Sequence, residues 1–125
     1  MIASCSSDQT IKLWDLRATK MQAVRSWVAH DCDVNVISWN SEIKFLLASG
    51  DDKGEFRIWD LRMLQDSKPG QTAESITRIR WHTKAITSIA FEPREDSTLA
   101  VASADNKLTM WDFSVEVDES EQVTD

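Results

Sequence analysis

The stretch FLLASGDDKGEFRIWDLR, residues 45–62, decides the fold of this chain. An apolar run leads through an Asp-rich turn into a second run of alternating apolar and polar residues, which ends in Trp59-Asp60. Two similar runs, TIKLWD and LTMWD, end in Trp14-Asp15 and Trp111-Asp112. Trp59 follows Trp14 by 45 residues, and Trp111 follows Trp59 by 52. The chain is therefore built from an internal repeat, which has to be recognised before any single segment is interpreted.

The segments between the Trp-Asp pairs read as strands throughout. Apolar runs at residues 34–39 and 86–91 are followed by second runs at 45–49 and 99–103, and residues 1–4 match these second runs. Outer runs at 21–28 and 76–81 alternate apolar with charged residues, as half-exposed strands do. No helical period competes with these patterns. Four short strands in a unit of roughly 40–45 residues that ends in Trp-Asp form one blade of a WD40 β-propeller.

The repeat predicts an all-β fragment of about three blades, arranged as an open arc of four-stranded antiparallel sheets. We assign residues 1–28 to an incomplete blade, 29–81 to a complete blade, 82–113 to a blade without its outer strand, and 114–125 to an acidic tail. Propellers close with four to eight blades, so the pattern favours a piece of a longer array. An open arc exposes strand edges, and we expect such a fragment to self-associate.

The recurring residues suggest a structural network inside each blade. A buried indole N–H needs an acceptor, and a His that donates to a turn Asp has its tautomer fixed. His30 and His82 each precede the Trp of their unit by 29 residues. The predicted members are Ser4, Asp8 and Trp14, then His30, Asp52 and Trp59, and finally His82, Asp105 and Trp111. The Ser or Thr that such a network needs is less regularly placed. In the second unit its position falls at Ala48 or Ser49, and in the third unit Ser103 is slightly displaced.

Composition restricts the partners and the compartment. The 125 residues carry a formal net charge of −7, which favours a basic partner and argues against direct nucleic-acid binding. Cys5 and Cys32 suggest neither a disulfide framework nor a zinc site, so we expect a reducing compartment. The sequence shows no signal-peptide pattern and no apolar run long enough to span a membrane. By elimination, these features favour the cytosol or the nucleus.

Two sets of charged residues are candidates for partner binding. Asp31, Asp33 and Asp51 lie in turns that should emerge on one face of the ring, where they would meet Lys or Arg of a partner. A merely solvated polar rim is the competing interpretation. Arg17 and Arg62 each follow a Trp-Asp pair by two residues and should lie on the opposite face. These two cations either bind a partner or pair with the preceding Asp.

The sequence offers no catalytic residue, metal site or cofactor. The 52-residue separation of His30 and His82 is the repeat itself, which favours structural roles. Cys32 follows His30 by two residues, yet no further ligands follow at zinc spacing. With three Gly in the chain, there is no Gly-rich phosphate loop and no nucleophile elbow. We therefore predict a protein that is not an enzyme.

Four segments carry a resemblance to a particular family. They are SCSSDQTIKLWDLR (residues 4–17), AHDCDVNVISW (29–39), the stretch 45–62 quoted above, and ADNKLTMWDFSVEVD (104–118). Together they resemble the C-terminal repeats of the glutamate-rich WD-repeat proteins. The retinoblastoma-binding type of histone-binding WD proteins has similar segments.

The resemblance implies a nuclear, and within it a nucleolar, chaperone of a basic ribosomal protein in large-subunit assembly; the cytoplasm is the second choice. The glutamate-rich segment that names the family is missing from this sequence. A histone-binding scaffold is one alternative, and charge does not distinguish it because histones are equally basic. A substrate receptor of a cullin–RING ubiquitin ligase is another, since the Trp-Asp-Leu-Arg segments ending in Arg17 and Arg62 resemble the boxes of such receptors.

Overall fold

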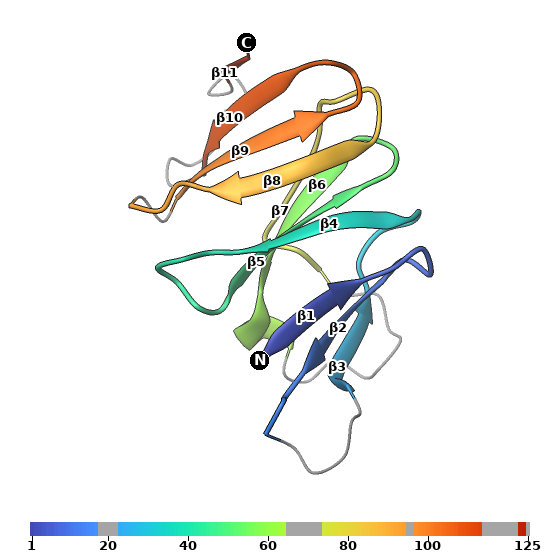
Figure 1. Ribbon diagram of the computed structural model, residues 1–125, viewed down its shortest axis with the longest axis vertical. Coiled ribbons are helices and arrows are strands. Elements are labelled where there is room, and N and C mark those ends of the chain that lie inside the picture. The colour runs from blue at the N-terminus through green and yellow to red at the C-terminus, as the bar shows by residue number, and fades with distance from the viewer. Residues whose placement is uncertain (18–22, 65–73, 95–96, 114–122, 125) are drawn as a thin grey trace.

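The computed structural model describes residues 1–17, 23–64, 74–94, 97–113 and 123–124. Within these ranges every strand belongs to one of three antiparallel sheets, which follow one another along the molecule (Figure 1). This arrangement confirms the all-β fold of propeller blades predicted from the repeat. No helix in the described ranges is long and apolar enough to cross a bilayer.

The first sheet holds β1 (Ile2–Cys5), β2 (Thr10–Trp14) and β3 (Ala23–Val28), paired in that order. The outer strand was predicted from residue 21, and residues 21–22 lie outside the described ranges. Gln9, in the turn between β1 and β2, has a φ of 74°. This turn presents the backbone carbonyl of Gln9 to the next connection, where it accepts from the N–H of Ala29 at 2.9 Å.

The second sheet is a complete blade. It contains β4 (Val34–Trp39), β5 (Leu46–Asp51), β6 (Glu55–Asp60) and β7 (Thr77–Arg80), paired in chain order. A 3-10 helix, η1 (Leu61–Leu64), follows β6 and was not predicted. It begins where the Asp60 carboxylate accepts from the backbone N–H of Arg62 at 2.9 Å, as a capping residue does. The longer spacing between Trp59 and Trp111 comes from an insert after β6, of which residues 65–73 lie outside the described ranges.

The third sheet contains β8 (Ile86–Phe91), β9 (Thr98–Ser103), β10 (Leu108–Asp112) and β11 (Val123–Thr124). β11 pairs with β10 through Thr109–Thr124 and Met110–Val123. From the sequence we expected no outer strand in this blade and a tail over the whole of 114–125, so the structure differs at this point. The surrounding acidic residues hid the two β-branched residues that form the strand.

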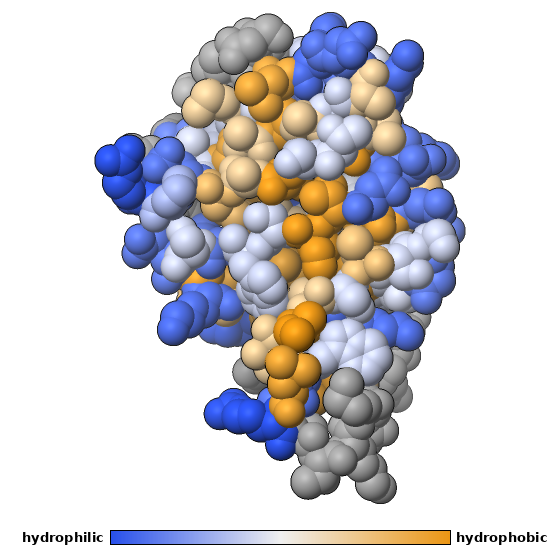
Figure 2. Space-filling view, in the orientation of Figure 1, coloured by the Kyte–Doolittle hydropathy of each residue, from blue (hydrophilic) through white to orange (hydrophobic). Residues whose placement is uncertain are grey.

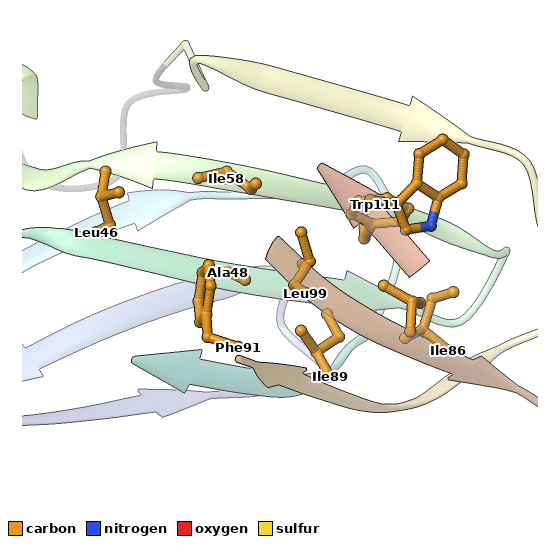
Figure 3. Close-up of a cluster of buried hydrophobic side chains, with 10 residues drawn as sticks. Leu46, Ala48, Ile58, Ile86, Ile89, Phe91, Leu99 and Trp111 are labelled. Carbon is orange, nitrogen blue, oxygen red and sulfur yellow. The ribbon is translucent and has the colours of Figure 1, made fainter. Parts of the chain in front are cut away.

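Two apolar cores hold the three sheets together. Between the second and third sheets, Leu46, Ala48 and Ile58 pack against residues of β8, β9 and β10, as Figure 3 shows. Phe56 belongs to the same core. Between the first and second sheets lies the other core, whose buried residues are Ile11, Leu13, Trp27, Ala29, Val34, Leu47, Trp59 and Leu64. Strands β5 and β6 thus supply alternate side chains to both cores. This agrees with the apolar runs expected for strands covered on both faces.

Apolar side chains also reach the surface. On the face shown in Figure 2 they gather in a band along the molecule, with polar residues on either side. The band follows the edge formed by β1, β4 and β8, which lie toward the viewer in Figure 1. The polar loops at the two ends of the strands are therefore separate surfaces, and they carry the charged candidates.

Candidate protein-binding surface and the network beneath it

In the middle blade, four side chains form one hydrogen-bonded network: Trp59, Ser49, His30 and Asp51. Nδ1 of His30 lies 2.8 Å from an oxygen of Asp51, and its Nε2 lies 2.7 Å from the hydroxyl of Ser49. The indole N–H of Trp59 donates to the same hydroxyl at 2.8 Å. One hydroxyl has a single proton to donate, so the order that satisfies every group runs Trp59 to Ser49 to His30 to Asp51. His30 then carries its proton on Nδ1.

The network uses Asp51, which corrects the sequence assignment of Asp52. Asp51 is fully buried and also accepts from the backbone N–H groups of Lys53 at 2.9 Å and Glu55 at 3.0 Å. Burial raises the pKa of this carboxyl, but the hydrogen bonds from His30 and the two N–H groups outweigh it and leave the pKa lowered. Asp52 is exposed and accepts from the Asn35 amide at 3.2 Å. Asp51 is therefore not a surface residue available to a partner.

In the third blade the hydroxyl comes from Thr109, which the sequence analysis missed. Nε2 of His82 lies 2.9 Å from the Thr109 hydroxyl, Trp111 donates to that hydroxyl at 2.6 Å, and Nδ1 of His82 lies 2.9 Å from Asp105. Ser103 instead donates to the carbonyl of Lys84 at 2.9 Å. The signal was present in the sequence, because a residue two before Trp111 on a strand shares its face.

The first sheet has a shorter version of the network. The indole N–H of Trp14 donates to the Ser4 hydroxyl at 3.0 Å, as predicted. Asp8 accepts from the hydroxyl of Thr10 at 2.6 Å and from its backbone N–H at 3.0 Å, and these bonds lower the pKa of the Asp8 carboxyl. Asp8 thus fixes its own turn rather than a histidine.

Above the middle network lies a group of exposed carboxylates, which we call the acidic rim: Asp31, Asp33 and Asp52. The first two precede β4, and the third is in the turn between β5 and β6. The carbonyl of Asp33 accepts from the backbone N–H of Asp52 at 3.0 Å and ties the two loops together. The rim therefore stands on a buried, fully hydrogen-bonded base.

One group at this end has ligand types that a metal would accept. Ligand atoms of Asp31, Cys32 and Asp51 lie within 4.8 Å of one another. Asp51, however, already accepts from His30 and from two backbone N–H groups. Burial, and next the neighbouring Asp51 charge, raise the pKa of the Cys32 thiol, which opposes the thiolate form a metal requires. This cluster is better suited to holding the loop than to holding an ion.

The predicted cations lie at the other ends of their strands and differ from each other. Arg62 forms a double contact with Asp60, at 3.1 and 2.9 Å, and stacks with its guanidinium carbon 3.7 Å from the Phe45 ring centre. The pKa of Asp60 is lowered by the hydrogen bond from Arg62. The Arg17 side chain is 92% exposed, and its Nε is 3.6 Å from Asp15. Arg62 is thus held by the preceding Asp60, whereas Arg17 contacts the preceding Asp15 only loosely.

A charged cluster beside the middle network was not foreseen. The buried Glu55 carboxylate accepts from Nε of Arg57 at 2.7 Å and Nε of Arg78 at 3.0 Å on one oxygen, and from Arg80 at 2.9 Å on the other. Burial raises the pKa of Glu55, but the hydrogen bond and charge of Arg57, followed by those of Arg78, lower it below its usual value. From the sequence, Arg78 and Arg80 were expected only to be charged residues of a half-exposed strand. The pairing of β6 with β7 brings them to Glu55.

Sheets of four antiparallel strands, stacked face to face and locked by Trp, hydroxyl, His and Asp, define a class of repeat proteins. The WD domain, G-beta repeat family matches residues 1–15, 21–60 and 73–112, and the chain belongs to this WD-repeat family.

Two characterised relatives are similar along nearly the whole chain. The ribosome assembly protein rrb1 of Schizosaccharomyces pombe is 42% identical over 123 residues, which are 98% of this chain and 25% of that protein. The histone-binding protein MSI1 of Saccharomyces cerevisiae is 30% identical over 117 residues, 93% of this chain and 26% of that protein. The chain thus spans about a quarter of the length of these relatives.

Proposed function

We propose that this chain forms part of a non-enzymatic scaffold that binds a basic protein, and that the partner is a ribosomal protein chaperoned during assembly of the large ribosomal subunit. The acidic rim carries this proposal, because Asp31 and Asp33 are exposed and stand over a rigid base. Such a surface would capture Lys- and Arg-rich segments by opposite charge and shield them from RNA. The similarity to a ribosome assembly protein supports this partner and a nuclear, nucleolar location.

The acidic rim would attract a cationic partner, and its side chains would lose little conformational entropy on binding. Asp carries a short side chain, and the two rim loops are linked by the backbone bond between Asp33 and Asp52. A carboxylate held in this way needs little reordering when a cation arrives. Exposed pairs of this kind are screened by salt, so the proposed binding weakens as ionic strength rises.

A double charge-neutralising substitution tests the proposal. In a pull-down with a basic ribosomal protein, Asp31→Asn with Asp33→Asn should weaken capture several-fold at low salt, since each exposed pair contributes about 0.2–1 kcal/mol. The control is Glu42→Gln with Glu74→Gln, which changes the net charge equally at exposed positions away from the rim. Equal loss in both double variants would show that only overall charge matters, and no binding by the unchanged protein would refute the proposal.

A histone is the second candidate partner, favoured by the similarity to a histone-binding protein. Charge alone does not separate the two partners. Affinities measured side by side for a histone tail and a ribosomal protein, at the same salt concentration, would distinguish them. Tighter binding of the histone tail would move the proposal to this second candidate.

A further inference from the structure

A pocket of about 420 Å³ lies beside the acidic rim, between the first and second sheets. Its lining residues are Gln9, Val28, His30, Asp31, Arg57 and Arg78. Two of the six are arginines, although the chain as a whole carries a net charge of −7. The pocket is thus locally cationic on an acidic protein, and its chemistry is opposite to that of the rim.

The two arginines are held in place by the charged cluster. Arg57 is buried, and it donates from Nη1 to the carbonyl of Ala29 at 2.6 Å and from Nε to Glu55 at 2.7 Å. Arg78 donates from Nε to the same Glu55 at 3.0 Å, and 64% of its side chain is exposed. Among the described residues, the two terminal nitrogens of Arg78 have no hydrogen-bond acceptor, and Nη2 of Arg57 has none either. These donors belong to side chains already fixed at the pocket wall.

Glu55 does not neutralise the cluster. One carboxylate faces three guanidinium groups, because Arg80 occupies its second oxygen at 2.9 Å. An excess of positive charge in a partly buried place favours an incoming anion. Guanidinium groups bind carboxylates through paired, charge-assisted hydrogen bonds, and an arrangement that is already fixed loses little entropy on binding.

The one acidic lining residue, Asp31, selects the kind of anion. Asp31 also borders the pocket, and its negative charge opposes a dianion such as phosphate more than a singly charged carboxylate. Asp31 also offers an acceptor for a backbone N–H beside the bound acid. We propose that this pocket binds the carboxylate side chain of an acidic peptide segment. This goes beyond the proposed function, which requires only the exposed carboxylates of the rim.

A blocked peptide with two adjacent glutamates is the probe, and its glutamine counterpart is the matched ligand. In a fluorescence-polarisation titration, Arg78→Gln should weaken binding of the acidic peptide about tenfold, as expected for loss of charged hydrogen bonds. Arg94→Gln removes the same charge at a side chain that is 91% exposed and outside the pocket, and it should leave binding unchanged. Tryptophan fluorescence and circular dichroism check that both variants are folded.

Three results would overturn the inference. The glutamine peptide binding as tightly as the glutamate peptide would exclude a carboxylate site. Equal losses in Arg78→Gln and Arg94→Gln would point to net charge rather than the pocket. Displacement of the peptide by inorganic phosphate at lower concentration than by acetate would identify a phosphoryl site instead. None of these results depends on whether a basic protein binds the rim.

Discussion

The middle and third blades build the same chain of hydrogen bonds from different positions. When the blades are aligned on Trp59 and Trp111, Ser49 of β5 corresponds to Val101, and Thr109 of β10 corresponds to Arg57. Val101 and Thr109 are paired directly across β9 and β10, as Ser49 and Arg57 are across β5 and β6. The hydroxyl has therefore moved to the residue opposite, on the same face of the sheet.

The exchange has a consequence for charge. With the hydroxyl on β5, position 57 of the middle blade carries an arginine that joins Glu55 and the cationic pocket. With the hydroxyl on β10, the third blade has Thr109 at that position and Lys107 in place of Glu55. A blade thus requires a hydroxyl at a point in space, not at a fixed sequence position. Of the two paired positions, only one supplies the hydroxyl. The side chain at the other position contributes to the charge of the blade surface, as Arg57 does in the middle blade.

Among the substitutions in these networks, the loss of Asp51 should destabilise the protein most. Asp51→Ala should lower the free energy of unfolding by about 3 kcal/mol, because His30 and two backbone N–H groups lose their buried, charged acceptor. The matched change Asp52→Ala removes an exposed acceptor and should cost about 0.5 kcal/mol or less. Urea unfolding followed by tryptophan fluorescence measures both. A larger loss for Asp52→Ala would restore the assignment made from the sequence.

Removing either hydroxyl should have the next largest effect. Ser49→Ala and Thr109→Val should each lower the free energy of unfolding by about 1–3 kcal/mol, since a buried indole N–H and a His lose their shared partner. Adding Val101→Ser to Thr109→Val would return a hydroxyl at the position that Ser49 occupies in the middle blade. Part of the lost stability should then be recovered, and no recovery would contradict the equivalence of the two positions.

Acid should destabilise the protein through the same carboxylates. Hydrogen bonds hold the pKa of Asp51 and Asp105 below their ordinary value despite burial. A carboxyl with a lowered native pKa stabilises the fold above its unfolded pKa of about 3.9, and this contribution is lost as pH falls through the native pKa. Unfolding measured from neutral pH down to about pH 3 should show falling stability, with a smaller slope in Asp51→Asn. Identical slopes in both proteins would count against a charged Asp51.

The smallest expected difference in stability is between substitutions of two buried tryptophans in the same core. Trp59 donates to Ser49, whereas the indole N–H of Trp27 finds no acceptor among the described residues. Both rings are buried, and they pack edge to face with centres 5.6 Å apart. Trp59→Phe should therefore cost about 1 kcal/mol more than Trp27→Phe, the worth of one hydrogen bond. Equal costs in thermal unfolding would indicate that the indole N–H of Trp59 contributes nothing.

Much of the fold was predictable because its signal is local. The inner strands at residues 34–39 and 86–91 were predicted at their observed bounds, since apolar runs and Asp turns mark strand ends. The Ser4–Trp14 and His82–Asp105 contacts followed from repeat spacing alone. Spacing works for the histidines because both full repeats place the histidine just before the first strand of the blade and the tryptophan on the third strand.

The parts that were missed depend on side-chain direction or on pairing between strands. Asp51 and Asp52 are adjacent, and a shift of one residue reverses which carboxylate faces inward, so composition does not choose between them. Thr109 was missed because the hydroxyl was expected near Ser103 and lies instead on the strand paired with it. The cluster on Glu55 requires the register of β6 against β7, which lie on either side of a long insert. No local pattern supplies that register.

In each of the two blades, hydrogen bonds run in one direction from the indole N–H through the hydroxyl and the histidine to the carboxylate. The most direct test of this order is at His30 and His82, the two histidines of the sequence. A long-range ¹H–¹⁵N correlation spectrum at neutral pH reports which ring nitrogen carries the proton. We expect both His30 and His82 to be protonated on Nδ1, which faces Asp51 and Asp105, and to accept a hydroxyl proton at Nε2. The Thr109 hydroxyl has a second acceptor in the carbonyl of Val101, but this lies at 3.4 Å, farther than His82 at 2.9 Å. Protonation on Nε2 alone, or rapid averaging of the two forms as in free imidazole, would contradict it.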